Sequence, residues 1–529
     1  MQIINRRSFF DRSLKLGMAT ALSTLVDIPW VVKQAMAQTQ GRIGLNGKKL
    51  LFVFLRGAND GLNSVIPIQD PAYNTTNRPT LVIPKDAATD YSKLGPCDFP
   101  QSGGSAATFA YANAIRLGNG FAALHPSLKF LAPVYNAGEL ALIHRVGYPK
   151  QSRSHFDSQN YWETGTPNKN LTKEGIFYRT MVESGLANTS PLTGVSIQSS
   201  LPLSLRGSQA AMTNLDDPNR YNLLGVPATT GDAKADAAIR AAGGASFPDK
   251  AYRGLLGLQY KNLTDTLAIF ASLNFSEAGN TFLDDENTDG DFPYHLFPTS
   301  NAKNGGYTRP GGGTEANKYV VDTGAYGFFN RLKSAALVLN KTDAIVAGTE
   351  FGGFDTHSRQ GAVTGSHPNL QRRIAWAMYA LRKYFTKYAD KTHWKDLVIV
   401  TLSEFGRTSV ENSDRGTDHA EAGVMFVGGG AVKGFGKGNT SGVFGCHPND
   451  SVPWVTGQTG SMFGVRDRYL KRSIDYRSVL GELIRDHLGA SSEQLNRIIP
   501  GYTVAGEALQ NGGTSTRDAT RIAGEIGIV

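Results

Sequence analysis

The chain of 529 residues is about 3.5 times the length of a typical domain, so it can form one large domain with insertions or two to three smaller domains. Hydrophobic residues make up 40% of the chain and charged residues 19%, which excludes general disorder and collagen-like repetition. The formal net charge is +9, but the basic residues are scattered along the chain and form no long run, which argues against a nucleic-acid partner.

Residues 1–37 have the pattern of a twin-arginine export signal. Arg6-Arg7 precede a mostly apolar stretch, and Ala35-Met36-Ala37 fits a cleavage site. The alternative is a single membrane anchor, but the apolar stretch is short for a span, rich in small residues and interrupted by Asp27. We therefore expect the twin-arginine export machinery as a partner, a periplasmic or secreted location, and no stable membrane span after processing.

The rest of the chain alternates between apolar runs and helical patterns. A continuous apolar run at 49–55 predicts a strand that is buried on both faces of a parallel sheet. A helical pattern at 125–138 and a strand at 140–143 follow, which is a β-α-β rhythm. The second half repeats it, and one α/β domain at 42–500, with a mostly parallel sheet flanked by helices, is expected. The later predicted elements are strands at 344–347, 397–401 and 424–427 and helices at 368–387 and 476–488.

Two segments depart from this α/β pattern. Residues 259–340 are enriched in Asn, Gly, Asp and Thr, which predicts an insertion or lid, and residues 501–529 have the composition of a weakly ordered tail. Within the insertion, Asp285 begins the D-x-N-x-D-G spacing of a calcium loop. Leu296 stands where an EF-hand requires Glu, so a solvated acidic loop is the favoured interpretation. The two cysteines, Cys97 and Cys446, are able to pair in an oxidising compartment, and the sequence leaves that question open.

Acidic side chains and histidines follow several of the predicted strands. Because open parallel sheets bind ligands beyond the carboxyl ends of their strands, we expect these side chains to meet at one sheet edge. Carboxylates and imidazoles from several strand ends suit one or two divalent ions of Zn, Mn, Ca or Fe better than a nucleotide. Each residue could instead be a turn residue, a helix cap or a surface ion-pair partner. The candidate metal ligands are Asp60, Asp355, His357, Glu404, Asp418 and His419.

The candidate catalytic residues are Arg153, Ser154 and His155, where a hydroxyl is flanked by a guanidinium and an imidazole. A serine beside a metal ion can attack phosphorus or sulfur, while an arginine holds the anionic oxygens of the ester. The alternative is a helix N-cap at Ser152 or Ser154. The chain has no glycine-rich phosphate loop, which argues against an NAD- or ATP-dependent enzyme.

The runs at 54–63, 152–165, 353–357, 403–407 and 416–419 resemble domain-of-unknown-function family 1501, an exported bacterial family with twin-arginine signals. The resemblance extends over the mature chain apart from the insertion and the tail. That family is similar in turn to the alkaline phosphatase and sulfatase superfamily, whose α/β sheet carries a metal-bound nucleophile. The resemblance therefore implies an alkaline-phosphatase-like fold.

The same resemblance implies particular roles for the candidate residues. Ser154 would be the nucleophile and Arg153 an anion clamp, and the acids and histidines after the strands would hold the metal. The chain departs from the superfamily at Glu404-Phe405, where an Asp-His pair is common, and neither cysteine has the sulfatase context C-x-P-x-R. The implied function is metal-dependent hydrolysis of a phosphate or related ester in an anionic or glycan-derived small molecule. The alternative is a non-catalytic envelope protein that binds glycans or partner proteins on the same fold.

Overall fold

The computed structural model describes eight longer stretches of the chain, together with isolated residues and pairs between them. The export signal predicted at 1–37, Cys97, the acidic loop that begins at Asp285 and most of the insertion lie outside the described residues. The structure therefore does not test whether Cys97 pairs with Cys446, which is buried. The described stretches are residues 43–85, 113–187, 192–210, 212–216, 294–299, 323–447, 472–504 and 524–529.

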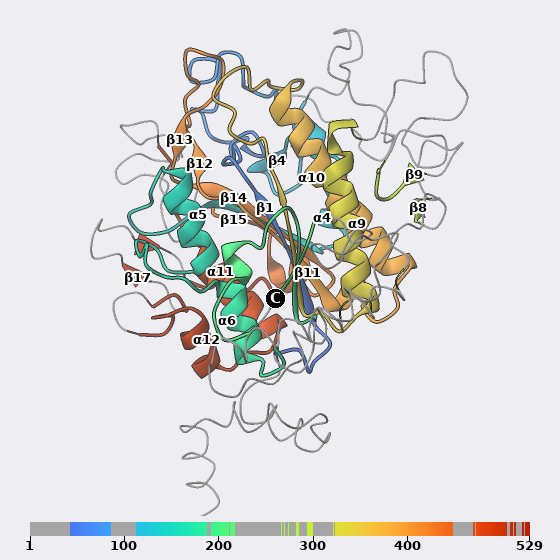
Figure 1. The fold of residues 1–529 in the computed structure, drawn as a ribbon. Helices are drawn as coiled ribbons and strands as arrows, with labels where there is room; N and C mark the ends of the chain where they lie inside the picture. Colours follow the sequence, from blue (N-terminus) through green and yellow to red (C-terminus); the bar gives the residue numbers. More distant parts are fainter. Residues whose placement is uncertain are drawn as a thin grey trace, which may run out of the picture.

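A nine-stranded mixed sheet forms the centre of the molecule (Figure 1). The strands β11, β1, β10, β6 and β7 run parallel as neighbours, and the antiparallel strand β14 separates β11 from β5. The short strands β15 and β16 both pair in parallel with β5. The strands of this sheet are β1 (Lys49–Leu55), β5 (Leu140–Gly147), β6 (Gly194–Ile197), β7 (Thr213–Leu215), β10 (Val346–Phe351), β11 (Leu397–Leu402), β14 (Gly423–Gly429), β15 (Val443–Phe444) and β16 (Ile474–Asp475).

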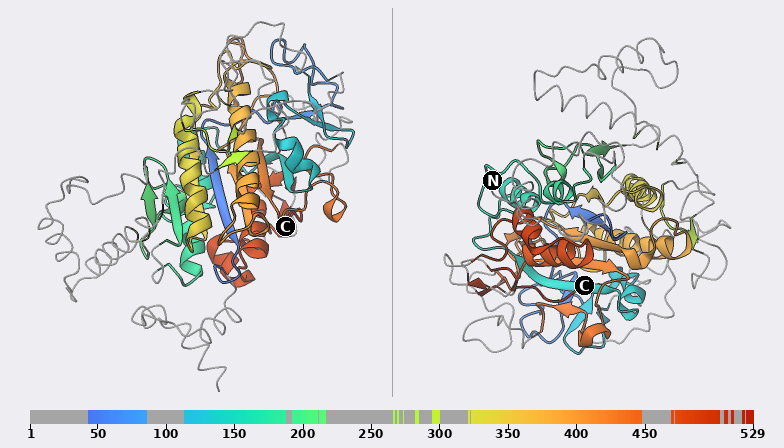
Figure 2. Two further views of the ribbon diagram at one scale, coloured as in Figure 1. Left: turned by 90° about the vertical axis from the view of Figure 1, so that its right-hand side faces the viewer. Right: turned by 90° about the horizontal axis from the view of Figure 1, so that it is seen from below.

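Helices cover both faces of the sheet and make a three-layered α/β protein (Figures 1 and 2). One face packs on α4 (Leu131–Asn136), α9 (Tyr326–Lys341) and α10 (Ser366–Lys387). The other face packs on α5 (His155–Thr164), α6 (Ile176–Glu183), α11 (Tyr476–Glu482) and α12 (Ser492–Ile498). This arrangement confirms the predicted α/β class with a mostly parallel sheet flanked by helices.

The central strand β1 shows why the sheet needs a helical layer on each side. Its side chains alternate between the two cores, with Leu51, Val53 and Leu55 in one and Leu50, Phe52 and Phe54 in the other. All seven residues of the strand are buried, as the continuous apolar run predicts. The register pairs Leu50 with Val346 on one side and with Val398 on the other, so β1, β10 and β11 end at the same edge.

Several predicted elements differ from those observed. The helix predicted at 125–138 is two pieces, a 3₁₀ helix η3 (Pro126–Leu128) followed by α4, because an unbroken helix would place Pro133 in its interior. The strand predicted at 344–347 lies later, as β10, and the strand at 424–427 runs antiparallel to its neighbours. The helix predicted at 476–488 is α11, continued through Leu483–His487 by a wider helical turn.

The remaining described elements are short and lie outside the main sheet. One small sheet, β2 (Val65–Pro67), β4 (Ala122–Leu124) and β3 (Ile115–Arg116), and one hairpin, β12 (Gly406–Arg407) and β13 (His419–Ala420), belong to loops. Two further strand pairs are β8 (Leu283–Asp284) with β9 (Tyr294–His295) and β17 (Gly513–Thr514) with β18 (Arg521–Ile522). Within the described stretches, every helix is too short or too polar to cross a bilayer. The remaining 3₁₀ helices are η4 (Leu203–Leu205), η7 (Thr323–Ala325), η8 (Trp394–Asp396) and η9 (Lys437–Asn439).

Candidate metal centre

Four ligand-type side chains meet beyond the carboxyl edge of the sheet. His155 is the first residue of α5, Asp355 and His357 follow β10, and His419 begins β13. The Nε2 atom of His419 lies 3.0 Å from Nε2 of His155 and 2.9 Å from Nε2 of His357. The Oδ1 atom of Asp355 lies 3.0 Å from Nε2 of His357, 3.3 Å from Nε2 of His419 and 3.5 Å from Nε2 of His155. We call these four residues the His/Asp cluster.

The opposite nitrogen of each histidine ring faces a hydrogen-bond acceptor. Nδ1 of His155 lies 2.8 Å from Oε1 of Glu404, and Nδ1 of His357 lies 3.3 Å from Oδ1 of Asp418. Nδ1 of His419 lies 2.9 Å from the carbonyl oxygen of Arg153. An acceptor at Nδ1 selects the tautomer that carries its proton there, which leaves Nε2 as a bare lone pair.

This tautomer pattern points several lone pairs and a carboxylate oxygen at one small region. Such a group is electrostatically unfavourable unless a proton or a metal cation lies among its members. Histidines that bind metals through Nε2 and are held at Nδ1 by a carboxylate or carbonyl are the usual arrangement in metal proteins. Among His155, Asp355 and His419, whose ligand atoms all lie within 4.8 Å of one another, the separations of 3.0–3.5 Å match the edges of a ligand tetrahedron, about 3.4 Å for metal–ligand bonds near 2.1 Å. These three residues offer a donor set and a spacing that suit a divalent cation, and His357 borders them through His419 and Asp355.

The cluster is open to solvent on one side and closed on the other. The side chains of Asp355 and His357 are 48% and 43% exposed, whereas Glu404 behind His155 is fully buried. Oε1 of Glu404 also accepts hydrogen bonds from the backbone N–H of Gly57 and the side chain of Gln159. Although burial alone would raise the pKa of Glu404, these hydrogen bonds, led by that from His155, lower it. Glu404 is therefore a carboxylate that orients His155.

Arg407 fixes the position of Asp355. Its buried guanidinium donates to Oδ1 of Asp355 over 2.5 Å and to the carbonyl oxygens of Ala58 and Thr417. Burial would raise the pKa of Asp355, but the hydrogen bond and charge of Arg407 lower it to about 2. Arg407 also stands opposite His419 in the β12–β13 hairpin, so one arginine holds two members of the cluster in register.

Two further residues support the cluster, and sequence reasoning assigned neither a role. The ring of Phe405 packs against His155 and His419, with centroids 4.8 and 4.7 Å apart, respectively. Oε1 of Gln360 accepts hydrogen bonds from the hydroxyl of Thr356, which stands between Asp355 and His357, and from that of Thr417, two residues before His419. Phe405 stands next to Glu404 in the sequence, which is a usable signal, whereas nothing in the sequence marks Gln360.

Of the six predicted metal ligands, Asp355, His357 and His419 lie in the cluster. Glu404 and Asp418 lie one layer behind it, each against a histidine Nδ1. Asp60 has other partners, because Arg78 pairs with both of its carboxylate oxygens and Gln360 donates to Oδ2. Burial would raise the pKa of Asp60, and the charge and hydrogen bonds of Arg78 lower it to about 2. We therefore leave Asp60 out of the metal centre proposed below.

The three predicted catalytic residues stand at the start of α5. Ser154 is the N-cap, and its hydroxyl oxygen accepts from the backbone N–H of Asp157. This is the alternative that the sequence left open for Ser154, and it places the hydroxyl directly before His155 in the chain. The guanidinium of Arg153 lies over the ring of Tyr469, 4.5 Å from the ring centroid. His155 was predicted as a catalytic residue and not as a metal ligand, and the structure places it in the His/Asp cluster.

The described residues thus define a three-layered α/β protein with a cluster of three histidines and an aspartate at the carboxyl edge of its sheet. Residues 315–450 match a family model whose description is protein of unknown function (DUF1501). The matched segment contains Asp355, His357, Glu404, Asp418 and His419, and it supports the family resemblance drawn from the motifs. Neither a curated protein nor a solved structure matched the chain.

Proposed function

We propose that this protein is an exported, metal-dependent hydrolase of phosphate or related esters. The observation that carries the proposal is the geometry of the His/Asp cluster, in which each histidine Nδ1 lies against an acceptor and each Nε2 lies against Oδ1 of Asp355. His155, Asp355 and His419 would hold one cation of the Zn, Mn or Fe type, with His357 beside them, because imidazole donors dominate the set. Calcium, which prefers oxygen ligands, fits this set less well.

When bound, a divalent cation would polarise the ester and neutralise charge on its oxygens. The residues of the chain would supply the rest of the chemistry. Ser154 precedes His155, and the N-terminal end of α5, where the Asp157 N–H donates to the Ser154 hydroxyl, favours negative charge on the attacking oxygen. Arg153 is exposed beside it and would hold the anionic oxygens of the ester. Attack by the Ser154 oxygen would break the ester bond to the alcohol, which leaves with the serine proton. Water would then add its hydroxyl to the transferred group and return its proton to the serine oxygen, which releases the anion.

Metal content is the first test of this proposal. Mass spectrometry of the natively exported, folded protein should find about one cation per chain, and both Asp355→Asn and His419→Ala should remove it. Asp60→Asn is the matched control, because Asp60 is an acid at the same sheet edge whose partners are Arg78 and Gln360. A wild-type protein that binds no Zn, Mn or Fe after reconstitution would overturn the metal centre.

Turnover of model esters is the second test. Phosphate monoesters, phosphate diesters and sulfate esters of p-nitrophenol cover the chemistry expected. Ser154→Ala should abolish turnover with metal content unchanged, and Ser152→Ala, which alters a neighbouring hydroxyl, should retain it. Full activity in Ser154→Ala would remove that residue from the role of nucleophile. A metal-loaded protein that turns over none of these esters would favour the non-catalytic envelope protein.

A further inference from the structure

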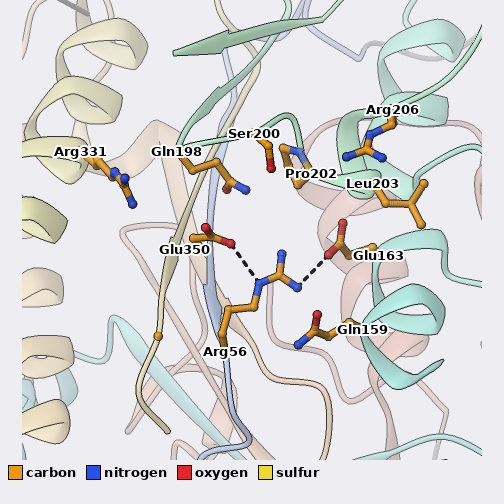
Figure 3. A pocket seen from close by; sticks show the side chains of 11 residues that line it. Arg56, Gln159, Glu163, Gln198, Ser200, Pro202, Leu203, Arg206, Arg331 and Glu350 are labelled. Carbon is orange, nitrogen blue, oxygen red and sulfur yellow. Dashed lines mark hydrogen bonds and ion pairs between the residues drawn. The ribbon is translucent and has the colours of Figure 1, made fainter. Parts of the chain in front are cut away.

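A polar hollow of about 450 Å³ lies next to the His/Asp cluster, over the carboxyl ends of β1, β10 and β6 (Figure 3). Its volume falls in the range of about 300–1,000 Å³ that is typical of small-molecule sites. Side chains from α5, from α9 and from the segment around η4 complete its walls. Most of the residues that line it are polar or charged, so its chemistry can be read from their hydrogen-bonding groups.

The floor of the hollow is a row of three charged side chains. Nε of Arg56 lies 3.1 Å from Oε2 of Glu350, and Nη1 of Arg56 lies 2.9 Å from Oε1 of Glu163. The guanidinium also lies over the ring of Phe54, 3.9 Å from its centroid. The third nitrogen of Arg56 points into the hollow, toward Gln198 and Ser200 (Figure 3). The guanidinium is therefore fixed in place and presents N–H donors to a ligand.

The order of groups on this floor is carboxylate, guanidinium, carboxylate, which alternates acceptors and donors. The amides of Gln159 and Gln198 and the hydroxyl of Ser200 add groups that can donate or accept. A hydroxyl group does both, so adjacent hydroxyls on one ring can use every member of the row. An anion only accepts, and the two carboxylates beside Arg56 would repel it.

The other two arginines of the hollow do not reverse this preference. Nη2 of Arg331 pairs with Oδ1 of Asp216 over 2.7 Å, which neutralises its charge locally. Arg206 is exposed and donates to the carbonyl oxygen of Leu201. An apolar ligand is also disfavoured. It would remove water from Glu350, Arg56 and Glu163 and offer no hydrogen bonds in place of those that water makes.

Helix α5 sets the distance between the hollow and the cluster. His155, Gln159 and Glu163 follow one another at intervals of four residues, so they lie on one side of this helix. Along the helix axis, Gln159 lies about 6 Å and Glu163 about 12 Å from His155. Gln159 connects the two places, since it lines the hollow and donates to the Glu404 carboxylate that holds His155. A single ring joined through an ester oxygen can cover this distance.

We infer that the hollow is a binding subsite for a neutral sugar ring, the alcohol part of an ester whose reacting group lies at the His/Asp cluster. The position of the reacting group rests on the function proposed above. The sugar subsite itself rests on the alternating row of Glu350, Arg56 and Glu163 and on the amides around it. It therefore makes predictions about binding that hold with or without turnover.

The test is calorimetric titration of the mature protein with the methyl glycosides of glucose, galactose, mannose and N-acetylglucosamine. At least one of them should bind to the wild type. Ser200→Trp, which places a large ring in the hollow, should weaken that binding roughly tenfold or more, the loss expected for more than one hydrogen bond. Ser199→Trp is the matched control, because Ser199 is the exposed neighbour that does not line the hollow. Circular dichroism and metal content establish that both variants are folded.

Three outcomes would overturn the subsite: no glycoside binds, binding is equal in Ser200→Trp and Ser199→Trp, or inorganic phosphate binds in the hollow in place of the glycosides. Repeating the titration on His419→Ala separates this inference from the proposed function. Glycoside binding that persists in His419→Ala and is lost in Ser200→Trp supports the subsite even if no ester is turned over. Equal hydrolysis of sugar phosphates by wild type and Ser200→Trp would leave the hydrolase standing and remove the subsite.

Discussion

Asp60 and Asp355 are both carboxylates that follow central strands at the same sheet edge, yet the structure treats them differently. Asp60, after β1, is fully buried and paired with Arg78, and Gln360 also donates to it. Asp355, after β10, has a half-exposed side chain, and its Oδ1 faces the Nε2 atoms of three histidines. Both carboxylates have an arginine partner, Arg78 for Asp60 and Arg407 for Asp355, but only Asp355 also lies against the imidazole nitrogens of three histidines.

This difference shows that an acid at a strand end is not by itself a metal ligand. What separates the two is the number of guanidinium contacts and the presence of histidines around the carboxylate. Arg78 gives Asp60 a bidentate partner, so a cation there would compete with a guanidinium. Arg407 gives Asp355 one contact, and the Nε2 atoms of three histidines lie against the same carboxylate oxygen. Asp60 and Gln360 instead support the loops that carry the cluster.

The largest effect is expected from Asp60→Ala, which leaves Arg78 charged and buried without its partner. Breaking a buried ion pair in this way costs about 3–5 kcal/mol of unfolding free energy. Urea denaturation measures the loss, and metal content of the folded fraction should stay at the wild-type value. If Asp60→Ala loses its metal at unchanged stability, Asp60 is a ligand and the contrast with Asp355 is wrong.

Lowering the pH should reveal the same buried pair in the wild-type protein. The folded pKa of Asp60, about 2, lies below its usual value, so the stability that this group contributes is present above pH 4 and is lost as the pH falls toward 2. The contribution is roughly 2 kcal/mol for a shift of this size. Asp60→Asn cannot titrate, so its unfolding free energy should fall less steeply over this range than that of the wild type. Parallel pH profiles of the two proteins would contradict this expectation.

A smaller effect is expected from Glu404→Gln, which keeps the shape behind His155 and removes the charge. Carboxylates that hold a metal-bound histidine contribute roughly 10–100-fold to metal affinity. Competition with a chelator of known affinity measures the change. Glu350→Gln is the control, since Glu350 lies at the same edge and pairs with Arg56. Equal affinities for the wild type and Glu404→Gln would argue against the cation site.

The smallest effect is expected from Asp418→Asn. The contact between Asp418 and His357 is longer, at 3.3 Å, and the Asp418 side chain is 35% exposed. Solvent screens such a pair, so we expect metal affinity to fall by less than in Glu404→Gln. The same chelator competition ranks the two variants. A larger loss in Asp418→Asn would show that His357 contributes more to cation binding than His155.

Five of the nine strands of the main sheet could be predicted, because burial on two faces gives a continuous apolar run, whereas β6, β7, β15 and β16 were not predicted. The apolar runs that became β1 and β11 have no polar face, and only strands between two helical layers need none. The direction of β14 could not be predicted. A strand that is buried on both faces is apolar whether it runs parallel or antiparallel to its neighbours. The break before α4 follows from Pro133, because a proline is accepted in the first turn of a helix but not in its interior.

The cluster could be predicted in part, for a similar reason. Asp355, His357 and His419 follow predicted strands, and the carboxyl ends of parallel strands meet in space. The place of His155 depends on the path from β5 into α5, which periodicity does not describe. The separation of Asp60 depends on Arg78, a residue in a loop with no regular pattern. Ion pairs between loops, such as that of Asp60 with Arg78, are therefore the part of the site that could not be predicted from the sequence.

The cluster joins parts of the chain that lie far apart in sequence. The contact from His155 to His419 spans 264 residues, and that from Asp355 to His419 spans 64. A cation held by these residues would be a cross-link between α5, the loop after β10 and the β12–β13 hairpin. Binding only to the folded chain would stabilise it by about 4 kcal/mol at a thousandfold excess over Kd. Thermal unfolding would then report on the cation, and a chain that folds before export would carry that cross-link with it.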